Sequence, residues 1–134
     1  VPAAVAAAFR CPERQVVTLV GDGGFMMTGN ELATAVQYEL PIKILLSDNG
    51  AFGTIRTHQE KHFPGRISAT ALTNPDFAMM ANAYGALGID VSDSDQIGPA
   101  LSQALEHHGP ALINFHSSLE HISAYTTIAG LRNK

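Results

Sequence analysis

Short apolar runs alternate with amphipathic segments along the whole chain. Four runs of five or six residues are mostly hydrophobic, and they occupy positions 16–20, 42–47, 87–91 and 111–116. Near-continuous hydrophobicity over this length is typical of parallel strands that helices cover on both faces. We therefore predict four parallel strands separated by helices.

Helical patterns surround the first two runs. The opening VPAAVAAAF fits the inner face of a helix, and Cys11 would lie near the end of that helix. Thr28 and Glu31 have the spacing of a capping box, which predicts a helix start between the first two strands. The apolar face of that helix comprises Leu32, Ala35, Val36 and Leu40.

Two more helices are predicted in the second half of the chain. The sequence Asn74-Pro75-Asp76 is a helix-start signal, and the helix that follows should stop near Gly85. Another helix is predicted from about residue 95 to residue 107, and the connection 56–74 is predicted to be a long loop. The inward positions of the last helix are Ile97, Leu101, Ala104 and Leu105.

The alternation of strands and helices predicts right-handed βαβ units. These units build an α/β fold with three layers, α/β/α, around a mainly parallel sheet. We interpret residues 1–134 as one domain of this kind. Because ligands of such sheets bind at the carboxyl ends of the strands, the turns after the first two strands are the leading candidates for a site.

Composition narrows the class of protein. Hydrophobic residues make up 46% and charged residues 15% of the chain, which fits a globular domain with faces buried against other domains or subunits. The net charge of −4 and the lack of a basic stripe argue against nucleic acid as a partner. No apolar run approaches the roughly 20 residues of a membrane span. The single cysteine fits a reducing compartment, so we expect the cytoplasm.

Two turns at predicted strand ends carry polar chemistry. Asp22 lies in the turn after the first strand, and Asn49 lies in the turn after the second. Parallel pairing would bring the two side chains together, and with a backbone carbonyl they form an oxygen ligand set that suits Mg²⁺ or Ca²⁺. Gly23 and Gly24 precede a helix whose N–H groups favour an anion. Together these features predict a diphosphate bridged to the protein by one Mg²⁺.

Each turn taken alone also fits a purely structural interpretation. Gly-Asp-Gly and Asp-Asn-Gly are both ordinary turn sequences. It is their occurrence at successive strand ends that favours a functional site.

One long segment resembles a known cofactor-binding motif. The sequence GDGGFMMTGNELATAVQYELPIKILLSDNGAFGTIR, residues 21–56, is similar to the motif of thiamine-diphosphate-dependent enzymes, which begins with Gly-Asp-Gly and ends at a pair of Asn residues. The whole chain can be aligned with the pyrophosphate-binding domain of the acetolactate synthase, pyruvate decarboxylase and benzoylformate decarboxylase group. The first Asn of the usual pair is Asp48 here.

The resemblance implies a set of cofactor-binding residues. Mg²⁺ would be bound by the side chains of Asp22 and Asn49 and by the carbonyl of Ala51, and backbone N–H groups at Gly23 and Gly24 would hold the diphosphate. Thr54 and Ile55 would lie near the thiazolium ring. The implied set is Gly21, Asp22, Gly23, Gly24, Asn49, Ala51, Gly53, Thr54 and Ile55.

The resemblance also implies components that these residues do not supply. A segment before residue 1 would support the bent cofactor, and a Glu from another domain of a partner subunit would activate it. We therefore assign no catalytic residue and expect a fragment of a larger multidomain chain, inactive by itself. The parent would be a homodimer or homotetramer, acting as a decarboxylase or carboligase on a 2-oxo acid and similar to acetolactate synthase.

Other interpretations remain open at this point. A nucleotide-binding α/β module would need a third glycine, which GDGGFM lacks. A non-catalytic protein could retain the fold as an assembly surface. His58 and His62 are four residues apart, a spacing that could bind a metal on one helical face, and His58 could instead face a substrate. A solvated histidine in a loop is the favoured interpretation over both.

Overall fold

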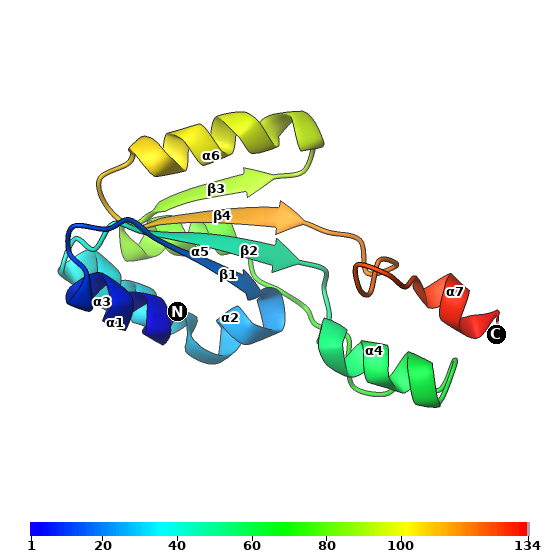
Figure 1. Ribbon diagram of the computed structural model, residues 1–134. Helices are drawn as coiled ribbons and strands as arrows, with labels where there is room; N and C mark the ends of the chain where they lie inside the picture. The colour runs from blue at the N-terminus through cyan, green and yellow to red at the C-terminus, as the bar shows by residue number, and fades with distance from the viewer. Residues whose placement is uncertain (134) are drawn as a thin grey trace.

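The computed structural model describes residues 1–133 and consists of a parallel sheet with helices on both faces (Figure 1). Within these residues the strands run in the order β1-β2-β4-β3. The strands are β1 (Val16–Gly21), β2 (Ile42–Asp48), β3 (Leu87–Val91) and β4 (Ala111–His116). All four predicted strands are confirmed, with β1 and β2 one residue longer than expected, and so is the three-layer α/β/α fold.

Helices connect the strands and form the two outer layers. They are α1 (Pro2–Arg10), α2 (Asp22–Thr28), η1 (Gly29–Glu31), α3 (Leu32–Gln37), α4 (Gly53–His62), α5 (Phe77–Tyr84), η2 (Ser94–Gln96), α6 (Ile97–Glu106) and α7 (Ile128–Arg132). Figure 1 shows α4 and α7 beyond the carboxyl ends of the strands, on the side where the predicted site lies. No helix of the described residues is both long enough and apolar enough to span a membrane.

The main core lies between the sheet and the helices α1, α2, α3 and α5. Phe25 from α2 and Phe77 from α5 are fully buried there, with their rings edge to face at a centroid distance of 5.5 Å. Ile44 and Leu112 fill the sheet side of this core. Since α2 and β2 both contribute to it, the same packing that stabilises the fold also fixes the elements from which Asp22 and Asn49 emerge.

The opposite face of the sheet is covered unevenly. Helix α6 packs over β3 and β4 through Ala100 and Ala104. On β1 the same face is open, with Val17 52% and Leu19 81% exposed. The expectation that every strand is covered on both faces is therefore wrong for β1 within residues 1–133, because α6 is displaced toward the other edge of the sheet.

The helix after β1 begins earlier than its capping pattern predicts. Helix α2 starts at Asp22, directly after the extended N-cap Gly21. Thr28 makes no side-chain cap bond, and Glu31 Oε2 instead accepts a hydrogen bond from Thr34 Oγ1 at 2.9 Å. The predicted capping box is thus wrong. The buried positions Leu32, Ala35 and Leu40 are confirmed, although Leu40 lies beyond the end of α3.

Helix α5 matches its prediction and α6 matches only in part. Asp76 caps α5 by accepting the Met79 N–H at 2.7 Å, and the helix ends at Gly85 with φ 91°. In α6 the predicted inward residues Leu101 and Ala104 do pack against the sheet, whereas Ile97 and Leu105 are 38% and 46% exposed. The inward assignment of these two is wrong, because the face of α6 that packs against the sheet consists of Ala100, Leu101 and Ala104.

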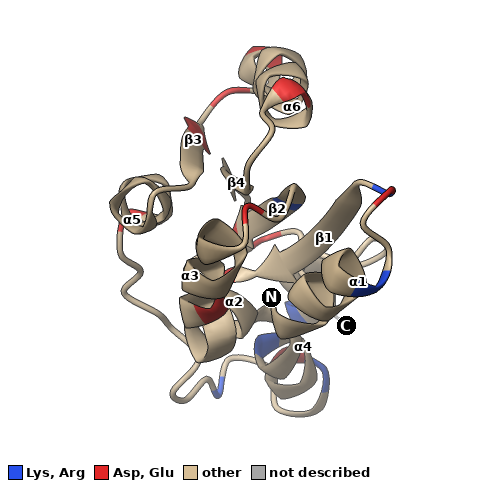
Figure 2. Ribbon diagram, turned by 90° about the vertical axis from the view of Figure 1, so that its left-hand side faces the viewer, with Lys and Arg blue, Asp and Glu red and all other residues tan. Residues whose placement is uncertain are grey.

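Charged residues are distributed unevenly over the molecule. Figure 2 shows Asp and Glu near β3 and α6, Lys and Arg near α4, and charges of both signs in the turn between α1 and β1. The first part of the connection 56–74, residues 56–62, belongs to α4 rather than to a loop, which corrects the prediction. Its apolar signal was weak because α4 is mostly polar.

Candidate functional site

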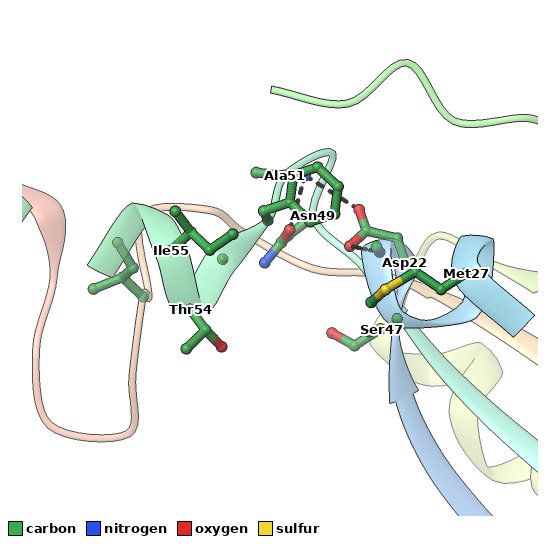
Figure 3. Close-up of a pocket in the computed structure, with 13 residues that line it drawn as sticks. Asp22, Met27, Ser47, Asn49, Ala51, Thr54 and Ile55 are labelled. Carbon is green, nitrogen blue, oxygen red and sulfur yellow. Dashed lines mark hydrogen bonds between the residues drawn. The ribbon is translucent and has the colours of Figure 1, made fainter. Parts of the chain in front are cut away.

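A cavity of about 490 Å³ opens at the carboxyl ends of β1 and β2 (Figure 3). All nine residues that the sequence singled out for cofactor binding line it. Four further residues, which the sequence did not suggest, also line the cavity. The complete lining is Gly21, Asp22, Gly23, Gly24, Met27, Ser47, Asn49, Ala51, Phe52, Gly53, Thr54, Ile55 and Ile122.

Asp22 is fixed by three hydrogen-bond donors from three segments. It is the first residue of α2 and only 2% exposed. Its Oδ1 accepts the Gly23 N–H at 2.8 Å, and its Oδ2 accepts the Ala51 N–H at 3.2 Å and the Asn74 Nδ2 at 2.8 Å. Three hydrogen bonds from separate donors leave this carboxylate little rotational freedom.

The turn after β2 brings the second predicted side chain to the same point. Asn49 Oδ1 accepts the Ala51 N–H at 3.0 Å, so the side chains of Asn49 and Asp22 share one backbone donor. Figure 3 shows both side chains reaching toward Ala51. Gly50 has a φ of 66°, a conformation that favours glycine, and it lets the chain turn between Asn49 and Ala51.

Close packing surrounds the Gly-Asp-Gly-Gly turn. A Cβ at position 23 would lie 2.6 Å from Phe52 Cδ1, so no larger residue fits there unless Phe52 moves. A Cβ at position 21 would meet nothing within 4 Å, because that backbone faces the open cavity. Gly23 thus permits contact between two protein segments, whereas Gly21 leaves space beside the backbone.

The cavity walls include apolar side chains from three elements. Met27 of α2 is 71% exposed and Ile55 of α4 is 53% exposed. Ile122 comes from the C-terminal segment, and its carbonyl accepts a hydrogen bond from Thr57 Oγ1 at 3.2 Å. Met27 could have been found from the sequence, because it lies one helical turn after Gly23 and so shares its face. Ile122 had no such local signal.

A buried ion-pair cluster holds the C-terminal segment against α4. Glu60 is fully buried and binds Arg56 Nε at 2.9 Å and Arg132 Nη2 at 2.7 Å. Hydrogen bonds from Arg132 are the main cause that lowers the pKa of Glu60 to about 2, with smaller contributions from the Gly65 N–H and Arg56. Burial acts in the opposite direction. Glu60 and Arg132 are 72 positions apart, so no local sequence pattern indicates this cluster.

The two histidines of α4 stack on each other. The rings of His58 and His62 are parallel with centroids 6.3 Å apart, and both residues are exposed. Within the described part of the chain, no group of three or more His, Cys, Asp or Glu residues could hold a metal ion. Of the predicted ligands Asp22, Asn49 and Ala51, only Asp22 belongs to these four residue types.

Comparison with known proteins identifies the family. The family model described as "Thiamine pyrophosphate enzyme, C-terminal TPP binding domain" matches residues 1–115. The chain belongs to this family. The matched range contains every cavity-lining residue except Ile122.

Curated relatives of this TPP-binding domain are much longer proteins. The Acetolactate synthase isozyme 2 large subunit of Escherichia coli is 43% identical over 122 residues, which cover 90% of this chain and 22% of the relative. The putative thiamine pyrophosphate-containing protein YdaP of Bacillus subtilis is 39% identical over 114 residues (84% and 20%). The Acetolactate synthase large subunit of Corynebacterium glutamicum is 38% identical over 121 residues (86% and 19%). The chain therefore spans about a fifth of each.

Proposed function

We propose that this TPP-binding domain holds the diphosphate end of thiamine diphosphate through one Mg²⁺, as part of an enzyme similar to acetolactate synthase. Asp22, Asn49 and the Ala51 carbonyl would be the protein ligands of the metal. The observation that carries the proposal is the convergence of Asp22 and Asn49 on the Ala51 N–H inside the cavity.

The donor set fits the proposed metal. All three proposed ligands offer oxygen atoms, which Mg²⁺ prefers. Mg²⁺ usually keeps several waters and substrate phosphate oxygens in its shell, so a small protein ligand set beside an open cavity is appropriate. The space beside the Gly21 backbone, which a side chain would occupy, lies next to Asp22 and suits a bulky diphosphate.

The remaining lining residues would bind and orient the rest of the cofactor. Gly24 and Gly53 offer close approach to the backbone, and Thr54 begins the wall formed by α4. Met27, Ile55 and Ile122 would exclude water from the reacting end. The chemistry that thiamine diphosphate supplies when bound is addition to a 2-oxo acid and loss of carbon dioxide, after which the product is released or joined to a second carbonyl compound.

The same proposal assigns the activating group to another part of the protein. Of the residues in the described range that line the cavity, Asp22 is the one acid, and it is committed to the metal. We infer that residues 1–134 form one domain of a larger multidomain chain, which matches the length of the relatives. A Glu from a partner subunit would complete the site in a cytoplasmic homodimer or homotetramer.

Thermal unfolding of the full-length protein tests the proposal. Thiamine diphosphate with Mg²⁺, at 100 times the dissociation constant, should stabilise the protein by about 2.7 kcal/mol, and NAD should give no shift. Asp22→Ala should abolish the shift, because it removes the anionic ligand. Asp95→Ala, at an exposed position of the same residue type, is the matched control and should keep it. A shift that survives Asp22→Ala would place the diphosphate elsewhere.

A further inference from the structure

We propose that Asn74 is a positioning residue that sets the orientation of Asp22 by tying it to Asp48. This inference rests on the proposed metal site and extends it to a side chain outside the cavity lining. Asn74 Nδ2 donates to Asp22 Oδ2 at 2.8 Å and to Asp48 Oδ1 at 2.7 Å. One amide group thus bridges two carboxylates from different elements.

The backbone delivers Asn74 to this point. After α4 the chain turns back and pairs with the turn that follows β2, through a bridge between Ala51 and Ala71. The Phe52 N–H donates to the Thr70 carbonyl at 2.9 Å, and the Leu72 N–H donates to the Gly50 carbonyl at 2.8 Å. Asn74 follows two residues after this pairing, so main-chain hydrogen bonds fix its approach.

The next residues anchor Asn74 from the other side. Pro75 restricts the backbone, and Asp76 caps α5 through the Met79 N–H. Asn74 is therefore held between a paired segment and a capped helix. Because the backbone is fixed on both sides of Asn74, this residue loses less conformational entropy on making its two hydrogen bonds than an amide in a flexible loop would.

The bridge suits the chemistry of the groups that it joins. An amide NH₂ has two hydrogens, one for each carboxylate, and a carboxylate has about four acceptor positions. Among the described residues, Asp22 Oδ2 receives two donors and Oδ1 receives one. The open acceptor position of Asp22 is therefore on Oδ1, and we infer that a cation would be met by this oxygen.

Asp48 gives the bridge its second anchor. Its Oδ1 also accepts the Gly50 N–H at 3.1 Å, within the turn that carries Asn49. Asn74 therefore links the orientation of Asp22 to the conformation of the turn after β2. This provides a physical role for Asp48, the position where the sequence departs from the usual Asn pair: it retains an oxygen acceptor for Asn74.

The test measures metal affinity rather than turnover. Mn²⁺ replaces Mg²⁺ in the full-length protein with saturating thiamine diphosphate, and bound Mn²⁺ is followed by electron paramagnetic resonance. Asn74→Ala should raise the dissociation constant of Mn²⁺ by about 10-fold or more, as is typical for residues that orient metal ligands. At saturating Mn²⁺ and cofactor, the KM for a 2-oxo acid should stay within about twofold, since Asn74 does not line the cavity.

Two controls separate positioning from general destabilisation. Gln59→Ala removes the hydrogen bonds of Gln59 to Ser68 in the same connection without touching either carboxylate, and it should leave Mn²⁺ affinity unchanged. Asn30→Ala, the second control, removes an exposed amide outside this connection and should also leave Mn²⁺ affinity unchanged. Asn74→Ser, which can donate one hydrogen, should give an intermediate dissociation constant and serves as the test if Asn74→Ala does not fold.

The results distinguish a failure of the proposed metal site from a failure of the proposed role of Asn74. If Asp22→Ala leaves Mn²⁺ and cofactor binding intact, the proposed metal site is wrong. If Asp22→Ala abolishes binding while Asn74→Ala and Asn74→Ser stay within twofold of the unmodified protein, the metal site stands and the positioning role is wrong. Equal weakening by Gln59→Ala would likewise overturn that role.

Discussion

The guanidinium group of Arg132 binds the buried carboxylate of Glu60 across 72 positions of the chain. Its Nε lies 3.0 Å from Oε2 and its Nη2 lies 2.7 Å from Oε1, a two-point contact that fixes α7 against α4. Ile122 precedes α7 and lines the cavity, so this ion pair also holds one wall of the site.

The Glu60 cluster predicts a specific dependence of stability on pH. The pKa of Glu60 falls from 4.5 to about 2 in the folded protein. Above about pH 4.5 the carboxylate is ionised in both states and its stabilisation is fully present. Between 4.5 and 2 the unfolded state takes up a proton that the folded state does not, so the stabilisation is lost progressively as the pH falls.

The variant Glu60→Gln isolates this effect. It should unfold at a lower temperature than the unmodified protein at pH 7, because charge-assisted hydrogen bonds worth about 1.5–3 kcal/mol each are weakened. The difference in melting temperature between the two proteins should narrow as the pH is lowered from 5 toward 3. A difference that stays constant over this range would show that Glu60 titrates alike in both states.

A second prediction concerns the contact between the two turns of the site. Gly23→Ala should destabilise the protein by about 1–3 kcal/mol, because the new methyl group overlaps the Phe52 ring. The combined variant Gly23→Ala with Phe52→Leu should recover part of the loss, as urea unfolding can measure.

The control for this substitution is another helical glycine. A Cβ at position 98, inside α6, meets nothing within 4 Å. Gly98→Ala should therefore stabilise the protein by about 0.5–1 kcal/mol. If Gly23→Ala were as stable as Gly98→Ala, the packing of Phe52 against the glycine turn would not constrain position 23.

A third prediction concerns activity. The 134-residue chain alone should not decarboxylate pyruvate faster than free thiamine diphosphate does, even with Mg²⁺ present. The reason is that no Glu lines its cavity in the described range, and the proposed activating group lies in a partner subunit. Carbon dioxide release measured against the full-length protein checks this. Turnover well above the free cofactor would require a base within these residues, with His58 the first to be substituted.

Local sequence signals predicted the strands and the two turns well. The apolar runs mark the strands because parallel strands need hydrophobic side chains on both faces, and Asp22 and Asn49 stand out because polar residues follow such runs directly. The capping pattern at Thr28 does not mark the helix start, because the glycine turn lets α2 begin at Asp22.

Long-range contacts account for what could not be predicted. The pairing of Glu60 with Arg132 and the bridge from Asn74 to Asp22, which spans 52 positions, depend on how the chain folds back on itself. No periodicity or spacing in one sequence carries that information. The same is true of Ile122, which reaches the cavity only because α7 is held against α4.

The open side of β1 limits the conditions in which the chain can be handled by itself. In the described residues β1 is an edge strand, and Val17 and Leu19 project from its uncovered face. An edge strand with unpaired backbone groups and exposed apolar side chains can pair with a second chain. In concentrated solution, self-association through this edge is therefore expected to compete with the folded monomer, and light scattering should rise with protein concentration before any ligand is added.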